Sequence, residues 1–304
     1  MHPTRLLVPL AALAAVHIPA SVDAQGAPAL SPNGRLAPLS AESALLVDPE
    51  GKTLFAKNAE DERAPASLVK LMTLFLAYED LDRGKVNIEE PVQVSHYAAL
   101  TPQYRMGLRG GEWVPLRALM EGVAIASAND AATALAERLA GDETAFVERM
   151  NAKAGELGLT GTRFVNAHGL PDPSQRSTAR DLAQLTAHLL RDYPASRTLL
   201  GGQTFVYAGR VYARHIPLFN DPVGVQALKT GFTREAGYNL AVSAWRGGQQ
   251  FVMIVLGSRS RSLSFLDAKR LLHYAFVEAG LEPDGRPRPE PRRLFRARPT
   301  TVAR

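Results

Sequence analysis

The chain has 304 residues, of which 46% are hydrophobic and 21% are charged, so it can bury a sizeable core and is not disordered in bulk. It contains no cysteine, which excludes disulfides, a cysteine nucleophile and thiolate metal sites. The net charge of +5 favours anionic partners.

The first 24 residues have the pattern of a secretory signal peptide. A basic start at Arg5 precedes an apolar run over residues 6–20, and small residues surround a cleavage point near Ala24. A buried first helix is the alternative, but Pro19 would break it. We therefore expect export, to the periplasm or otherwise outside the cytoplasm. The positive charge then points to weak association with cell wall or membrane surfaces and away from nucleic acid.

The mature chain is expected to begin with a flexible lead over residues 25–40, which is rich in Gly, Ala, Pro and Ser. A β-hairpin follows, with strands over 44–47 and 53–56 and a turn at Asp48–Gly51. The region 65–195 is mostly helical in pattern. Its expected helices cover 65–81, 116–125, 131–140, the segment from Asp142 through Met150, and 182–190.

Three helix starts carry capping residues. Asn129 or Asp130 is expected to cap the helix over 131–140, Asp142 the next, and Ser177 or Thr178 the helix that follows. After Pro194 the pattern changes to strands, and a last amphipathic helix closes the domain. The expected strands are 204–207, 211–213, 225–230, 238–245 and 250–256, and the helix is 262–279.

Strands therefore occupy both ends of the chain and helices its middle. This order predicts an α+β fold, with an antiparallel sheet flanked by helices and a crevice between the sheet and the inserted helical part. One catalytic domain is expected over residues 41–280, followed by a Pro/Arg-rich tail at 281–304 with seven Arg, two Glu and one Asp. We expect that tail to be mobile and without an apolar helical face.

A serine and a lysine stand three residues apart at the start of the first expected helix. Positions i and i+3 share a helix face, so Ser67 and Lys70 can point to one place. An unprotonated lysine can take the proton of a serine hydroxyl and make it a nucleophile. The spacing alone occurs by chance about once in a chain of this length. Taken alone, Lys70 would be a solvated helix residue.

Two further stretches change this interpretation. Ser127-Ala128-Asn129 directly precedes a helix of the helical part, and Lys229-Thr230-Gly231 lies at the end of a strand of the sheet part. Each has an ordinary structural alternative, as helix caps and as an exposed strand end. A lone histidine, His168, has no second histidine at metal spacing, so we expect it to have a structural role in a loop beneath the site. We expect no metal and no cofactor.

In order, spacing and setting, the three elements resemble the motif set Ser-x-x-Lys, Ser-x-Asn and Lys-Thr-Gly of penicillin-binding proteins and class A β-lactamases. The sequence is similar to the D-alanyl-D-alanine carboxypeptidases among the low-molecular-mass penicillin-binding proteins, over about residues 37–280. The resemblance implies a β-lactamase/transpeptidase-like fold with a five-stranded antiparallel sheet. The stretches that carry it are "PASLVKLMT", "SANDAATALAE", "GTRFVNAHGLPDPSQRSTARDLAQL" and "KTGFTREAGYNLAVSA".

The resemblance also implies roles for individual residues. Ser67 would attack the carbonyl between two D-alanines of a peptidoglycan stem peptide, with Lys70 as its general base. Ser127 would relay a proton to the leaving D-alanine, and Asn129 would hydrogen-bond the substrate and Lys70. The backbone N–H groups of Ser67 and Phe232 would form the oxyanion hole.

The substrate's terminal carboxylate would be bound on the opposite wall. Lys229 and Thr230 would meet it, Gly231 would let the substrate backbone lie against the strand, and Arg214, fifteen residues before Lys229, would help to hold it. β-Lactam antibiotics would acylate the same serine and inhibit the enzyme.

Three alternatives stay open. A class A β-lactamase needs a glutamate after the Ser-x-Asn motif, with an asparagine four residues further on. The only glutamate in residues 155–181 is Glu156, and no asparagine follows it at that spacing. A D,D-endopeptidase acting on peptidoglycan crosslinks is the nearer alternative. A wall-binding protein with an inactive site is the third, and the presence of every motif residue disfavours it.

Overall fold

The computed structural model describes residues 36, 38–220 and 224–281. The expected signal peptide at 1–24 and the tail after Leu281 lie outside the described residues, as does most of the expected lead at 25–40.

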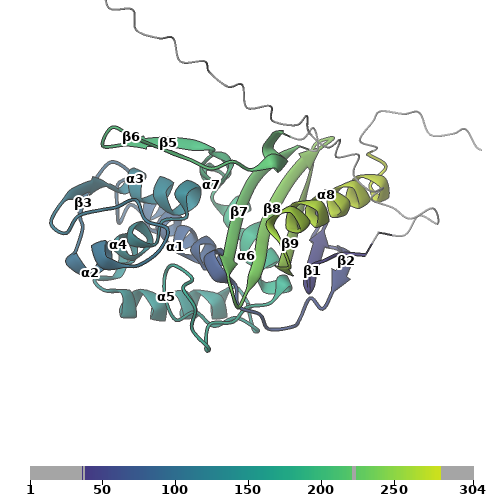
Figure 1. Cartoon of the computed structure of the whole chain (residues 1–304), viewed down its shortest axis with the longest axis horizontal. Coiled ribbons are helices and arrows are strands. Elements are labelled where there is room, and N and C mark those ends of the chain that lie inside the picture. Colours follow the sequence, from purple (N-terminus) through teal and green to yellow (C-terminus); the bar gives the residue numbers. More distant parts are fainter. Residues whose placement is uncertain (1–35, 37, 221–223, 282–304) are drawn as a thin grey trace, which may run out of the picture.

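A five-stranded antiparallel sheet joins the two ends of the described chain, which confirms the expected fold class (Figure 1). Its strand order is β2-β1-β9-β8-β7, so the first hairpin pairs with the last strands through β1 and β9. The strands are β1 (Ser43–Val47), β2 (Thr53–Lys57), β7 (Val225–Thr233), β8 (Gly237–Arg246) and β9 (Gln249–Ser258).

Both faces of this sheet are buried. Alternate residues of each strand point to opposite faces, and each face packs into a hydrophobic cluster. In β9, Val252 and Ile254 join one hydrophobic cluster, whereas Met253 and Val255 join another. The second cluster is closed by the long helix α8 (Arg261–Glu278), which lies on one face of the sheet in Figure 1. The first continues into the helical part of the chain, so one side of the sheet supports the inserted helices.

The helical part lies between β2 and β7, as expected. Its helices are α1 (Lys70–Asp82), α2 (His96–Leu100), α3 (Leu116–Glu121), α4 (Asn129–Ala140), α5 (Glu143–Glu156), α6 (Ala179–Asp192) and α7 (Ala195–Gly201). Short turns of 3₁₀ type (Ala66–Val69, Pro217–Asn220) and π type (Gly122–Ala126) complete it. Two small hairpins also occur, β3 (Pro91–Gln93) with β4 (Trp113–Pro115), and β5 (Thr204–Tyr207) with β6 (Arg210–Ala213).

Several expected details are corrected by the structure. Neither Asn129 nor Asp130 caps α4; Ala128 occupies the N-cap position and makes no side-chain bond there. The expected helix caps Asp142 and Thr178 are confirmed, since each accepts a hydrogen bond from a backbone N–H of the first turn. The stretch after Pro194 begins with α7 and not with a strand.

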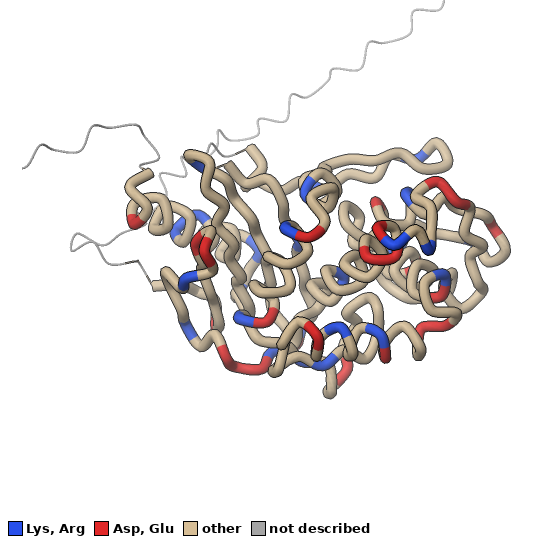
Figure 2. The backbone as a smooth tube through the Cα atoms, turned by 180° about the vertical axis from the view of Figure 1, so that it is seen from behind, with Lys and Arg blue, Asp and Glu red and all other residues tan. Residues whose placement is uncertain are grey.

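In the view of Figure 2, Lys and Arg residues are interspersed with Asp and Glu residues along the described backbone. The seven-arginine tail that contributes much of the positive charge falls outside the described residues. No helix of the described ranges is both long and apolar enough to cross a membrane.

Candidate active site

Lys70 is the first residue of α1 and is fully buried. Its Nζ lies 3.0 Å from Ser67 Oγ and 2.7 Å from Asn129 Oδ1, and it also contacts the main-chain oxygen of His168. Burial lowers the pKa of Lys70 to about 7, although the charge of Asp130 acts in the opposite direction. The lysine can therefore be neutral near physiological pH, as a general base must be.

The second motif lies where the π turn ends and α4 begins. Ser127 has a left-handed backbone (φ 55°), which turns the chain sharply before the helix. Asn129 donates from Nδ2 to the oxygen of Pro102 at 2.9 Å and from its backbone N to the oxygen of Tyr104 at 2.7 Å. Its Oδ1 faces Lys70, so this amide is committed to the site and not to capping.

The third motif comes from β7 on the sheet side. Lys229 is buried, and its Nζ donates to Ser127 Oγ at 2.8 Å and to the oxygen of Thr230 at 3.0 Å. Burial lowers the pKa of Lys229 well below its ordinary value, and the charges of Lys70 and Arg214 lower it further. Three basic groups thus converge where an anion would relieve their repulsion.

A cavity of about 570 Å³ lies between the two halves and brings the motifs together. Of the site residues expected from the sequence, six line this cavity: Ser67, Ser127, Arg214, Thr230, Gly231 and Phe232. A Cβ on Gly231 would lie 3.0 Å from the backbone N of Ser67. The backbone of β7 therefore lies so close to the 3₁₀ turn that contains Ser67 that a side chain at position 231 would be crowded. The proposed oxyanion donors, Ser67 N–H and Phe232 N–H, therefore belong to segments that border one cavity.

Arg214 reaches the cavity, but most of its guanidinium is committed to the protein. It donates to the main-chain oxygens of Gly202 (2.8 Å), Ala124 (3.2 Å) and Leu228 (2.9 Å), and also to that of Leu200. Burial lowers its pKa to about 10. Its expected role in carboxylate binding stays a prediction, beside a structural role that the sequence did not reveal.

Tyr104 and Arg261 are among the cavity-lining residues that the sequence did not predict. Tyr104 is 58% exposed at the mouth and has a positive φ of 30°. Arg261, at the start of α8, lines the same cavity and donates to the oxygen of His215 at 2.6 Å. A cation at the first position of a helix is unfavourable with respect to the helix dipole, and this unusual placement is the sequence feature that could have drawn attention to Arg261.

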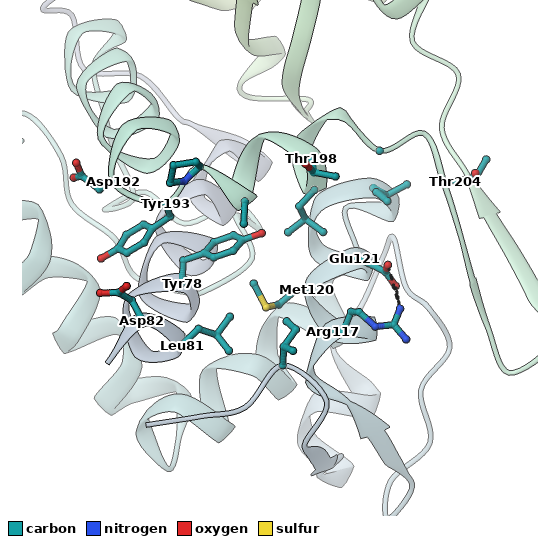
Figure 3. A pocket seen from close by; sticks show the side chains of 16 residues that line it. Tyr78, Leu81, Asp82, Arg117, Met120, Glu121, Asp192, Tyr193, Thr198 and Thr204 are labelled. Atoms are coloured by element: carbon teal, nitrogen blue, oxygen red, sulfur yellow. Dashed lines mark hydrogen bonds and ion pairs between the residues drawn. The ribbon is translucent and has the colours of Figure 1, made fainter. Parts of the chain in front are cut away.

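A second and larger cavity has a volume of about 900 Å³ (Figure 3). Tyr78 and Tyr193 point into it with their rings stacked 6.0 Å apart, and Arg117 pairs with Glu121 at its rim. It holds no serine among its lining residues, so it lacks the nucleophile that lines the smaller cavity. Ile125 lines both cavities.

Within residues 36, 38–220 and 224–281, no group of three or more His, Asp or Glu side chains is placed to hold a metal ion. Burial, with a smaller contribution from Lys70, lowers the pKa of His168 to about 3, so this imidazole is neutral.

Comparison with known proteins places this geometry in a family. The model of the D-alanyl-D-alanine carboxypeptidase family, Peptidase_S11, matches residues 31–260. D-alanyl-D-alanine carboxypeptidase DacF of Bacillus subtilis is 35% identical over 250 residues, covering 80% of this chain and 64% of its own length. DacC of Escherichia coli is 37% identical over 233 residues, covering 74% and 58%. The chain thus spans about three fifths of the length of these relatives.

Solved structures agree with the sequence comparison. Penicillin-binding protein 5 from Haemophilus influenzae superposes with a TM-score of 0.77 at 32% identity, over 79% of this chain and 72% of that one. Penicillin-binding protein D2 from Listeria monocytogenes, in its cefotaxime-bound form, gives 0.69 at 32% identity, over 79% and 98%. With its three motifs gathered around one cavity, the chain belongs to the D-alanyl-D-alanine carboxypeptidase family of low-molecular-mass penicillin-binding proteins.

Proposed function

We propose that the protein is a serine-type D-alanyl-D-alanine carboxypeptidase that removes the terminal D-alanine from peptidoglycan stem pentapeptides. One observation carries this proposal: a buried lysine whose pKa is lowered to about 7 has its Nζ 3.0 Å from Ser67 Oγ. A serine with such a neighbour can lose its proton as it attacks a carbonyl carbon.

The first half of the reaction forms an ester. The substrate's terminal carboxylate binds to Lys229 and Thr230, with a contribution from Arg214, and its charge favours the protonated form of Lys229. Ser67 Oγ bonds to the carbonyl carbon of the penultimate D-alanine while its proton passes to Lys70. The N–H groups of Ser67 and Phe232 stabilise the resulting oxyanion.

The tetrahedral intermediate then collapses, and the bond between carbon and the leaving nitrogen breaks. Ser127, hydrogen-bonded to Lys229, relays the proton from Lys70 to the amine of the departing D-alanine. Asn129 keeps Lys70 and the substrate backbone in place. Water next attacks the ester and gives a proton to Lys70, and Ser67 Oγ leaves with that proton, which restores the enzyme.

β-Lactams would acylate Ser67 in the same way. Penicillin-binding protein D2 from Listeria monocytogenes has been solved with cefotaxime bound and with ampicillin bound. The β-lactamase alternative is disfavoured, because Glu156 lies on the surface, with 63% of its side chain exposed, and forms an ion pair with Lys153. We therefore expect the penicilloyl ester to persist and the enzyme to be inhibited.

A D,D-endopeptidase is the second candidate, and one comparison favours it. A D-alanyl-D-alanine endopeptidase from Pseudomonas aeruginosa is 31% identical over 244 residues, covering 77% of this chain and 76% of the relative. The two activities share the acylation chemistry and differ in the size of the leaving group. The mouth of the cavity, where Tyr104 is exposed, would decide between them.

We place this activity outside the cytoplasm, at the cell wall. The signal-peptide pattern at residues 1–24 and the family's substrate support that location. The basic tail would add weak attraction to anionic wall or membrane surfaces.

The test is to incubate the purified chain with a pentapeptide ending in D-Ala-D-Ala and to measure free D-alanine, beside a Ser67→Ala control. Release by the wild type that is lost in the control supports the carboxypeptidase. Release that survives Ser67→Ala contradicts the mechanism. Cleavage of a crosslinked muropeptide dimer without release of D-alanine would favour the endopeptidase.

A further inference from the structure

The loop 166–170 presents two consecutive main-chain oxygens to one face of α1. The oxygen of Ala167 accepts a hydrogen bond from Thr73 Oγ1 at 2.6 Å, and the oxygen of His168 accepts one from Lys70 Nζ. Thr73 and Lys70 are three residues apart and share a helix face. The loop is therefore docked onto the turn of α1 that carries the general base.

The contact with His168 has a consequence for the direction of proton transfer. A neutral lysine amine has two hydrogens and one lone pair. Around Lys70 Nζ lie two acceptors other than the nucleophile, Asn129 Oδ1 at 2.7 Å and the oxygen of His168. If each accepts one hydrogen, the lone pair remains for the hydroxyl of Ser67 at 3.0 Å.

The imidazole of His168 supports its own main-chain oxygen. Its Nδ1 accepts from the backbone N–H of Leu170 at 3.1 Å, so the ring proton belongs on Nε2. That Nε2 lies 3.4 Å from Glu143 Oε1, and both side chains are largely buried. The ring is neutral at ordinary pH, so it acts here through shape and hydrogen bonding and carries no charge.

Glu143, in the first turn of α5, holds the loop from below. Its Oε1 accepts from the backbone N–H of Ala167 at 2.9 Å, and its Oε2 accepts from the hydroxyl of Tyr97 at 3.0 Å. The side chain is 11% exposed, which leaves little water to replace these contacts. The carboxylate of Glu143 thus contacts the backbone N–H of Ala167 and the imidazole ring of His168, the two residues whose main-chain oxygens face α1.

We propose that Glu143 and His168 are positioning residues that fix the His168 main-chain oxygen beside Lys70, so that the amine's lone pair faces Ser67. This inference rests on the proposed function. Their side chains do not contact Ser67 Oγ or Lys70 Nζ; the contact with Lys70 is made by the main-chain oxygen of His168. The charged or titratable groups around Lys70 are Asp130 on α4, Lys229 on β7 and the neutral His168 itself.

The test measures acylation of Ser67 by a fluorescent penicillin in the full chain at pH 8.5, where Lys70 is mostly neutral. For each variant, the labelled fraction at long times counts correctly folded sites, and the second-order rate constant reports the base. His168→Ala and Glu143→Gln are expected to lower the rate constant roughly tenfold to a hundredfold at full labelling. Glu148→Gln, an exposed position on the same helix, is the matched control and should keep the wild-type value.

A conservative variant separates positioning from folding. His168→Asn retains a side-chain acceptor that can reach the N–H of Leu170, and it should recover most of the rate constant lost in His168→Ala. A purely structural role would reduce the labelled fraction and leave the rate constant unchanged, and that result would overturn the proposal. If His168→Ala does not fold, Glu143→Gln carries the same test. A wild type that is neither labelled nor able to release D-alanine would instead overturn the proposed function.

Discussion

Lys229 Nζ donates a hydrogen bond to Ser127 Oγ at 2.8 Å, although the two residues are 102 positions apart in sequence. Lys229 belongs to β7 of the central sheet, and Ser127 ends the π turn of the helical part. The bond therefore links the sheet part to the helical part next to the cavity that Ser127 lines. It would make the proposed carboxylate-binding wall and the proposed proton relay parts of one network, because a substrate anion bound to Lys229 would compete with Ser127 for its ammonium group.

The pH dependence of acylation should follow the lysine beside the nucleophile. Lys70 must be neutral to act as a base, and burial lowers its pKa to about 7. Acylation by penicillin should therefore rise with pH through about 7 and level off above it. Stopped-flow labelling between pH 5 and 9 measures this limb. A rate that stays flat across that interval would show that the proton is taken by another group.

Asp130 supplies a second test of the same lysine. The charge of Asp130 raises the pKa of Lys70 against the effect of burial. Asp130→Asn should therefore lower that pKa, so that the rise of the acylation rate with pH occurs at lower pH. The same carboxylate accepts N–H bonds from Met106, Gly107 and Leu108, so the variant should also be less stable by about 2–3 kcal/mol. Asp142→Asn, which keeps a good helix cap, is the control and should leave the limb in place. An upward shift in Asp130→Asn would contradict the electrostatic explanation.

The cluster of basic groups predicts that the substrate's terminal charge matters. Lys229, Lys70 and Arg214 repel one another, and a carboxylate relieves that repulsion while an amide does not. A peptide ending in D-alanine amide should therefore show kcat/KM lower by roughly tenfold to a hundredfold, the value of a charge-assisted hydrogen bond. In Lys229→Met the two peptides should become nearly equivalent. Equal rates for both peptides in the wild type would remove Lys229 from carboxylate binding.

Sequence reasoning was sufficient for the sheet and for the meeting of the three motifs. Strands with apolar residues at consecutive positions, such as residues 251–256 in β9, could be assigned because both faces of the sheet are covered. The meeting of the three motifs was expected from the resemblance to the motif set of penicillin-binding proteins, because each motif taken alone has an ordinary structural explanation. The sequence did not reveal which tertiary hydrogen-bond partner each side chain has in the fold. Asn129 resembles a cap locally, yet Lys70 Nζ and the oxygen of Pro102 occupy its amide in the fold.

Two other features were out of reach for the same reason. The helix α7 is short and ends at glycine, so its pattern resembles a loop until packing against β7 makes it helical. The four main-chain oxygens around Arg214 come from segments between residues 124 and 228, and no local pattern links them. Long-range hydrogen bonds to backbone carry no sequence signature, because every residue offers the same oxygen.

Gly169 should be intolerant of any side chain. Its φ is +89°, and a Cβ there would lie 2.1 Å from the oxygen of Ala66, next to the nucleophile. Gly169→Ala should lower the free energy of unfolding by about 3 kcal/mol or more, since backbone strain and a clash add together. Gly84→Ala, at φ +65° with nothing within 4 Å, isolates the backbone cost of about 1–2 kcal/mol. Equal losses in the two variants, measured by urea unfolding, would show that the loop yields to the added methyl group.

Arg214 should have separable effects on stability and on substrate binding. In Arg214→Lys a single ammonium replaces the planar fork that serves four main-chain oxygens, so the free energy of unfolding should fall by about 2–4 kcal/mol. Arg210→Lys, an exposed position whose Nη1 is 3.5 Å from the oxygen of Met106, should change it by less than about 0.5 kcal/mol. If Arg214 also contacts the substrate, KM should rise for the peptide that ends in a carboxylate and stay constant for its amide. A rise of equal size for both peptides would leave Arg214 with its structural role alone and would shift the search for the carboxylate's second partner to Arg261.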